Sequence, residues 1–177
     1  MLDIIILGGR ILDGSGGPGF MADIGISEGR FKVVGNLSQA EAGRIIDARG
    51  YAVSPGFIDT HTHSEGSLLL DPQHANGLRQ GITTEFLGID GMSYAPLSHD
   101  NYLTYRHWLS GLLEYPPEDL DMSSVSAFRS NYDLKVAVNT VYMVPNGTVR
   151  LEAVGFRDVP LVGESMEKAK RLVIEGM

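Results

Sequence analysis

Two histidines, one residue apart, follow a short apolar segment. The stretch PGFIDTHTH, residues 55–63, places His61 and His63 directly after the apolar residues Phe57 and Ile58. Alternate residues of a strand point to the same side, so both imidazoles would face one point at the strand's end. In parallel α/β sheets and barrels this end carries the functional site, and neutral imidazole is a common zinc ligand. The pattern favours a metal site over the alternative, a polar pair at a loop mouth.

A carboxylate occupies the corresponding place after the next apolar segment. Asp90 follows the β-branched, apolar run 82–87 and stands between Gly88 and Gly91. If the two runs are neighbouring parallel strands, this carboxylate reaches the same edge and supplies an oxygen ligand. The alternative is an Asx turn in a glycine-rich loop. We predict His61, His63 and Asp90 as metal ligands.

The segment NGTVR, residues 146–150, follows a third expected strand and also faces this edge. The guanidinium of Arg150 can hold a substrate carboxylate through paired hydrogen bonds. We therefore predict Arg150 and Asn146 as substrate-binding residues, the alternative for Arg150 being an ordinary surface position.

The elements that would position these residues change in character along the chain. Residues 1–54 alternate short apolar runs with glycine turns, which predicts a small antiparallel sheet or half a sandwich. From residue 55 to 177, strands alternate with helices, which indicates βαβ units and a parallel sheet. A chain of this kind that ends on a helix usually continues into another strand, so we expect a truncated protein. The expected strands are 52–63, 82–87 and 135–144, and the expected helices are 71–79, 100–114, 122–130 and 165–175.

The composition of the chain limits the kinds of molecule that it is expected to bind. The chain has 177 residues, of which 43% are hydrophobic, as in ordinary globular proteins. Its formal net charge of −8 argues against a nucleic-acid partner. The absence of cysteine excludes disulfides, thiolate ligands and a cysteine nucleophile. No stretch approaches the roughly 18 apolar residues of a membrane span, and the N-terminus lacks the form of a signal peptide, so we expect a cytoplasmic protein without a membrane partner.

Four motifs in order carry a resemblance that covers the whole chain. They are ILDGSGGPGFMADIGISEGR, IIDARGYAVSPGFIDTHTH, QGITTEFLGIDGMSYAP and VAVNTVYMVPNGTVR. Together they resemble the amidohydrolase superfamily and, within it, the N-acyl-D-amino-acid deacylase (D-aminoacylase) family. PGFIDTHTH alone would indicate only the superfamily, and the GITT, SYAP and GTVR elements make the resemblance more specific.

The resemblance implies a fold and a reaction. The fold would be a metal-dependent (β/α)₈ barrel with a small β-sandwich, of which this chain supplies the sandwich segment 1–54 and the first barrel strands in 55–177. The reaction would be hydrolysis of the amide of an N-acyl-D-amino acid, usually with zinc. His61 and His63 match the family's first-strand metal pair. Asp90 stands where D-aminoacylases carry a cysteine ligand, and Asn146 where a histidine is common.

The resemblance also implies that part of the site lies outside the chain. Such a barrel needs about 250 residues, whereas residues 57–177 provide about half of that. The later metal histidines and the general-base aspartate belong to strands beyond these, so no catalytic residue is identified here. The expected partners are a small N-acyl amino acid and either further copies of the chain or a missing C-terminal half.

Two alternative functions remain open. One is another amidohydrolase reaction, such as cyclic-amide hydrolysis by a dihydroorotase or hydantoinase relative. The other is a non-catalytic polypeptide that acts as a half-enzyme or an oligomerising fragment.

Overall fold

Two compact units make up the chain. The structure, a computed structural model, describes all 177 residues, and contacts between residues divide them into Met1–Pro55 and Gly56–Met177. Each unit contains its own sheet, and together they give a mixed α/β protein. No helix combines the length and the apolar character needed to cross a membrane.

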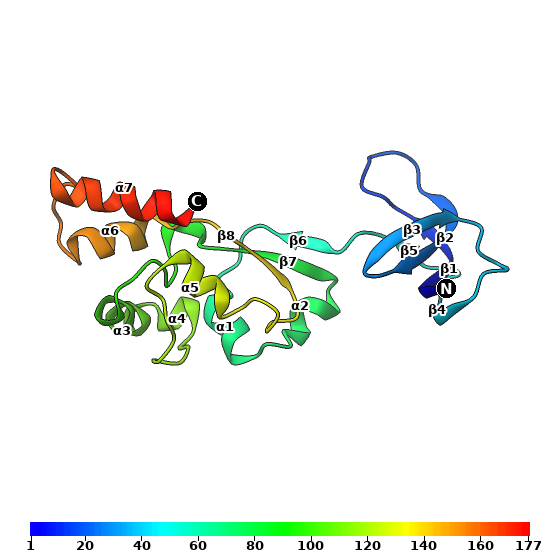
Figure 1. Ribbon diagram of the computed structural model, residues 1–177, viewed down its shortest axis with the longest axis horizontal. Coiled ribbons are helices and arrows are strands. Elements are labelled where there is room, and N and C mark those ends of the chain that lie inside the picture. The colour runs from blue at the N-terminus through cyan, green and yellow to red at the C-terminus, as the bar shows by residue number, and fades with distance from the viewer. The chain divides into compact units, whose positions relative to one another are not determined.

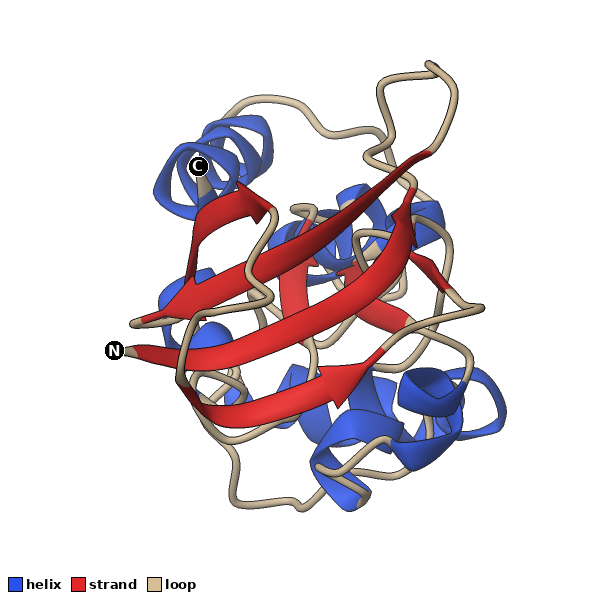
Figure 2. Ribbon diagram, turned by 90° about the vertical axis from the view of Figure 1, so that its right-hand side faces the viewer, coloured by secondary structure: helices blue, strands red, loops and turns tan.

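The first unit is a five-stranded sheet of mixed direction. Its order is β3-β2-β1-β4, with β5 also paired to β1. β1 and β3 are antiparallel to β2, whereas β4 and β5 run parallel to β1, so the expected antiparallel sheet holds only for the first three strands. Figure 2 shows these curved strands side by side, with the N-terminus at the start of β1. The strands are β1 (Leu2–Ile11), β2 (Phe20–Ser27), β3 (Arg30–Gly35), β4 (Ala42–Asp47) and β5 (Ala52–Val53).

Gly8 and Gly9 form a bulge rather than the expected turn. β1 continues through both, and its register against β2 shifts between Ile6 and Gly9. Gly8 has φ +68°, which glycine adopts without penalty, and its N–H donates to Asp23 Oδ1 at 2.7 Å. The other carboxylate oxygen of Asp23 accepts the N–H of Leu37 at 2.8 Å. One carboxylate therefore secures the bulge and the segment after β3.

The second unit is a parallel three-stranded sheet with helices packed along one face, as Figure 1 shows. The core under this face includes Leu68, Leu87, Tyr94, Tyr102 and Phe128. The three strands form an open sheet and no closed barrel. Its elements are β6 (Phe57–Asp59), α1 (Glu65–Leu70), α2 (Ala75–Arg79), β7 (Ile82–Leu87), the 3₁₀ turn η1 (Ile89–Gly91), α3 (His99–Trp108), α4 (Ser110–Leu113), α5 (Val125–Ser130), β8 (Asn139–Tyr142), α6 (Asn146–Val154) and α7 (Glu164–Gly176).

Several expected elements are divided or shortened by backbone constraints. The expected strand 52–63 becomes β5 and β6, separated around Pro55, which has no N–H to give to a sheet. The expected helix 71–79 starts only at α2, because Asp71 precedes Pro72 and is biased away from helical geometry. The expected helix 100–114 divides at Leu109 into α3 and α4, and the expected strand 135–144 shortens to β8.

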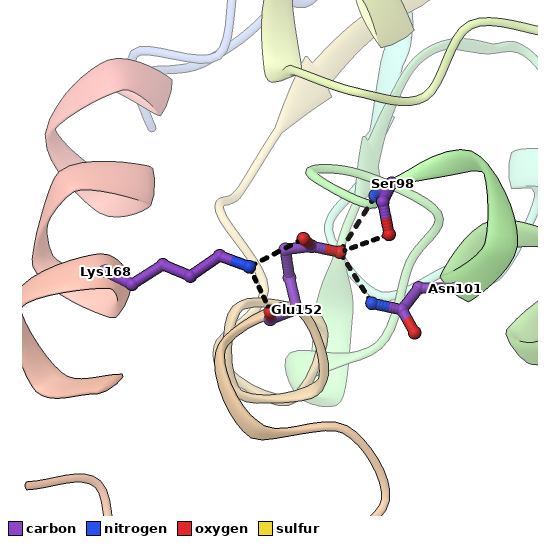
Figure 3. Close-up of polar contacts among 4 residues, drawn as sticks. All are labelled: Ser98, Asn101, Glu152 and Lys168. Atoms are coloured by element: carbon purple, nitrogen blue, oxygen red, sulfur yellow. Dashed lines mark hydrogen bonds and ion pairs between the residues drawn. The ribbon is translucent and has the colours of Figure 1, made fainter. Parts of the chain in front are cut away.

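Helix α6 was not expected, and it starts directly after β8. A carboxylate on this helix, Glu152, joins it to two other helices (Figure 3). Its Oε1 accepts from Lys168 on α7 at 2.8 Å, and its Oε2 accepts from the N–H of Ser98 and from Asn101, both at 2.8 Å. Burial raises the pKa of Glu152, but these hydrogen bonds outweigh burial and hold that pKa below its usual value.

Candidate metal centre

The structure brings His61, His63 and Asp90 together at the carboxyl ends of β6 and β7. Asp90 Oδ2 lies 3.1 Å from His61 Nε2 and 3.4 Å from His63 Nε2. One ligand atom from each residue lies within 4.8 Å of the other two, and this is the only group of three or more such residues in the chain. The three side chains predicted as ligands therefore share one point in space.

Turns of the backbone after β6 and β7 bring the three side chains to this point. β6 ends at Asp59, whose Oδ1 accepts the N–H of His61 at 3.1 Å and closes a turn. After β7 the chain bends through left-handed residues, with φ +83° at Gly88, +57° at Asp90 and +76° at Gly91. Asp tolerates this conformation better than most residues, because its short side chain bonds locally. The bend returns the Asp90 carboxylate toward the histidines.

The three ligand candidates differ in exposure. The side chain of His63 is 19% exposed, whereas those of His61 and Asp90 are 64% and 50% exposed. Nδ1 of His63 is buried and has no hydrogen-bond partner. His63 is thus held within the unit, and the other two residues border solvent from which an ion and a substrate can arrive.

The donor set fits a divalent ion of the zinc type. Zinc binds imidazole nitrogen and carboxylate oxygen at about 2.0–2.2 Å, so two ligands of a tetrahedral ion lie about 3.3–3.5 Å apart. The separations of 3.1 and 3.4 Å from Asp90 Oδ2 to the two imidazole nitrogens are close to that range. Two nitrogens and one oxygen would leave positions for further ligands or water, as catalytic sites do.

A completely buried carboxylate, Glu65, lies behind the centre. Its Oε1 accepts the N–H of Gly88 at 2.9 Å, and its own carbonyl oxygen accepts the hydroxyl of Tyr132 at 2.8 Å. Burial raises the pKa of Glu65, while the Gly88 N–H, the side chain of Ser93 and the charge of His63 act in the opposite direction. Sequence reasoning missed this residue. Its signal was an acidic side chain just after the histidine pair and just before the apolar residues of α1.

A second buried carboxylate, Glu85 on β7, is fully partnered. It accepts from His74 Nε2 at 2.6 Å and from the hydroxyl of Ser64. His74 occupies the position before α2, with φ +44°, and its imidazole is mostly buried against Glu85.

No family model matches the chain, but individual proteins do. It is 40% identical over 129 residues to an N-acyl-D-aspartate deacylase of Alcaligenes xylosoxydans xylosoxydans, a match that covers 64% of this chain. A crystal structure of D-aminoacylase, described as defining a subset of amidohydrolases, superposes with a TM-score of 0.85 and 30% identity over 99% of this chain. A zinc and phosphonate-inhibitor complex of N-acyl-D-glutamate deacylase from Bordetella bronchiseptica gives a TM-score of 0.84 over 97%.

These matches support the D-aminoacylase family of the amidohydrolases as the family that this chain resembles. The chain spans only 26% of the N-acyl-D-aspartate deacylase and 36% of the D-aminoacylase structure.

The NGTVR segment forms the start of α6. Asn146 is exposed beside the Asp90 loop, since a Cβ on the adjacent Gly147 would lie 2.6 Å from the Gly91 carbonyl oxygen. Arg150 lies one turn further along, where its Nη2 donates to the carbonyl oxygens of Arg157 and Val159 at 3.2 and 2.5 Å. The structure thus places Asn146 next to the centre and gives Arg150 a role in fixing the segment after α6.

Arg150 also lines a shallow pocket with aromatic walls. The rings of Tyr105 and Phe156 lie 6.1 Å apart, and Trp108 packs on Phe156 at 5.6 Å. The pocket is lined by Tyr105, Gly147, Arg150, Leu151, Gly155, Phe156, Arg157 and Asp158.

Proposed function

We propose that this chain supplies part of a metal-dependent hydrolase that cleaves the amide bond of N-acyl-D-amino acids. The observation that carries the proposal is the meeting of His61, His63 and Asp90 at one point, in a chain whose relatives include deacylases of N-acyl-D-aspartate and N-acyl-D-glutamate. The metal we propose is zinc, because the donor set is nitrogen and oxygen at zinc-like spacing.

The fold we propose for the complete protein is a (β/α)₈ barrel beside a β-sandwich. Three parallel strands covered by helices on one face are the way such a barrel begins. In this proposal the five-stranded sheet of the first unit is one layer of the sandwich. The exposure of apolar residues such as Phe31, Val34 and Ile45 on that sheet supports a second layer.

In the proposed reaction a bound divalent ion would lower the pKa of a water molecule and polarise the acyl carbonyl. His61 and His63 would hold the ion through Nε2, and Asp90 through a carboxylate oxygen. Asn146, exposed beside the Asp90 loop, would contact the substrate. Arg150 uses Nη2 for both of its hydrogen bonds to the chain, so its Nε and Nη1 remain as donors for a substrate carboxylate.

The test starts from the gene. If the reading frame continues past codon 177, the longer product is assayed. If a second gene encodes the remainder, the two polypeptides are mixed. We expect release of free D-amino acid from N-acetyl-D-amino acids, its loss on chelation with recovery on adding zinc, and much slower turnover for Asp90→Asn.

Two outcomes would replace the proposal. Turnover of hydantoins or dihydroorotate without turnover of N-acyl-D-amino acids would assign the cyclic-amide reaction. A purified protein with a loaded metal site and no hydrolysis of either class would favour the non-catalytic alternative. We expect the 177-residue chain alone to be inert, because the proposed general base lies outside it. Its activity as a monomer would overturn that part of the proposal.

A further inference from the structure

Three buried side-chain atoms in the whole chain lack a hydrogen-bond partner, and they lie on residues around the candidate centre. They are His63 Nδ1, Glu65 Oε2 and Ser93 Oγ. Leaving a buried polar atom unpaired costs about 1–3 kcal/mol, so such atoms are uncommon in folded proteins. Their concentration on the histidine segment and on the loop after Asp90 points to a local arrangement that serves the site.

Glu65 connects these two segments directly. It begins α1 just after the histidine pair, and its Oε1 accepts the N–H of Gly88 at 2.9 Å. This hydrogen bond crosses 23 residues of sequence and is buried. Glu65 is itself fixed, because its carbonyl oxygen accepts the hydroxyl of Tyr132 and its side chain is completely buried.

Gly88 is the residue at which the chain turns toward the centre. Its φ of +83° is followed by φ +57° at Asp90. A Cβ at Gly88 would lie 2.1 Å from the Met143 carbonyl oxygen, so the end of β8 packs tightly on the other side of this residue. Held by Met143 on one side and by Glu65 on the other, the peptide of Gly88 has a fixed orientation, and that orientation sets where Asp90 points.

We propose that Glu65 is a positioning residue, which acts through the Gly88 N–H to hold the Asp90 carboxylate against His61 and His63. The inference rests on the proposed metal site. Glu65 lies two positions after the proposed ligand His63 and would not itself contact the metal. Removing a residue that orients a metal ligand typically lowers metal affinity about 10–100-fold.

Two substitutions separate this role from general stability. Glu65→Gln keeps an oxygen that accepts the Gly88 N–H, whereas Glu65→Met has a similar volume and only a weakly accepting sulfur. Leu68→Ala is the matched control, because Leu68 is equally buried on the same helix and makes no contact that the proposal invokes. All three are made in the 177-residue chain, and each thermal midpoint is recorded.

The readouts are cobalt affinity, the visible spectrum of bound cobalt, and the imidazole ¹⁵N signals of His61 and His63 without metal. We expect Glu65→Met to weaken cobalt binding by about 10–100-fold, to change the spectrum and to shift both histidine signals. Glu65→Gln should resemble the unsubstituted chain, and Leu68→Ala should lower only the thermal midpoint.

The inference is overturned if Glu65→Met lowers the midpoint as Leu68→Ala does and leaves the affinity, the spectrum and the imidazole signals unchanged. If the unsubstituted chain binds no cobalt, the affinities are measured in the longer product that completes the site, and absence of bound cobalt there would contradict the proposed metal site. The metal-free imidazole signals still decide whether Glu65 positions Asp90 against the histidines.

Discussion

Asp23 in the first unit and Glu65 in the second make the same kind of hydrogen bond, but the two bonds have different roles. Each carboxylate accepts the N–H of a glycine with positive φ, Gly8 in one case and Gly88 in the other. Asp23 uses both oxygens, and the N–H groups of Leu37 and Gly8 hold its pKa below the usual value. Glu65 pairs one oxygen only, and burial raises its pKa.

We call each of these hydrogen bonds from a glycine N–H to a carboxylate a tie. The Asp23 tie supports the fold alone, whereas the Glu65 tie serves the candidate site. The fully paired Asp23 secures a β-bulge in a unit that contains no cluster of potential metal ligands. Glu65 secures the loop that carries Asp90 through one oxygen, and its other oxygen lies in the core near the Ser93 side chain with no backbone partner. Damage to the two ties should therefore have separable consequences for the two units.

Removing both imidazoles should have the largest effect on the second unit. We expect His61→Ala/His63→Ala to weaken zinc binding by more than about 100-fold, since even residues that only orient ligands contribute 10–100-fold. Equilibrium dialysis measures this, with His107→Ala, an exposed histidine on α3, as the control. Equal zinc content in the double variant and the unsubstituted chain would contradict the proposed site.

The two glycines should respond differently to alanine. At Gly88 a Cβ would meet the backbone oxygen of Met143 at 2.1 Å, whereas at Gly8 it would meet the flexible side chain of Arg49 at 2.5 Å. Both variants incur about 1–2 kcal/mol for the left-handed conformation. Only Gly88→Ala should add a clash that the backbone must relieve, and only Gly88→Ala should weaken metal binding.

Chemical denaturation and zinc titration of both variants measure these effects. Gly111→Ala is the control, because this glycine lies in α4 with open space around it. Equal destabilisation by Gly8→Ala and Gly88→Ala, with zinc affinity unchanged in both, would remove the distinction between the two ties.

Asp23→Asn should loosen the first unit alone. The amide retains one acceptor oxygen and turns N–H donors toward the second backbone N–H. We expect faster hydrogen exchange at Gly8 and Leu37, with exchange in β7 and β8 unchanged. Asp23 has a folded pKa below its unfolded value, so its contribution is present above about pH 3.9 and disappears as the pH falls through the lower folded pKa. Faster exchange in both units would show that the tie is not local.

The sequence predicted the meeting of the three side chains better than it predicted the surrounding elements. The strand alternation expected at His61 and His63 was wrong, because β6 ends at Asp59 and both histidines follow it. The parallel pairing of β6 with β7 was nevertheless enough to bring Asp90 to the same edge as the histidines. Their role as metal ligands stays a prediction. The resemblance to D-aminoacylases agrees with the relatives and structures that match the chain.

What the sequence did not reveal depends on contacts between distant segments. Gly8 and Gly9 read as a turn, because the Asp23 carboxylate that stabilises a bulge there lies 15 residues away. Helix α6 was not predicted, because local pattern does not show that Thr148 exchanges hydrogen bonds with the backbone of Ser93. Glu65 was missed for the same reason, since its partner Gly88 is 23 residues away.

The smallest predicted effect concerns Glu152, a third carboxylate that, like Asp23, has partners for both oxygens. Its folded pKa is held below the unfolded value by Lys168, Asn101 and Ser98 against the effect of burial (Figure 3). A depressed carboxyl pKa contributes stability above the unfolded pKa of about 4.3, and that contribution is lost as the pH falls through the folded pKa. We therefore expect Glu152→Gln to lower the unfolding free energy of the second unit by about 1 kcal/mol at pH 7. The difference from the unsubstituted chain should shrink progressively below pH 4.3.

Urea denaturation at pH 7 and below pH 4.3 measures this difference in unfolding free energy. The control is Glu167→Gln, which removes an exposed ion pair with Lys170 on α7 and should cause no measurable change. Because both oxygens of Glu152 are already occupied, zinc affinity should stay unchanged in this variant. A loss of affinity would mean that a fully paired carboxylate also serves the centre, which would contradict the distinction drawn between Asp23 and Glu65.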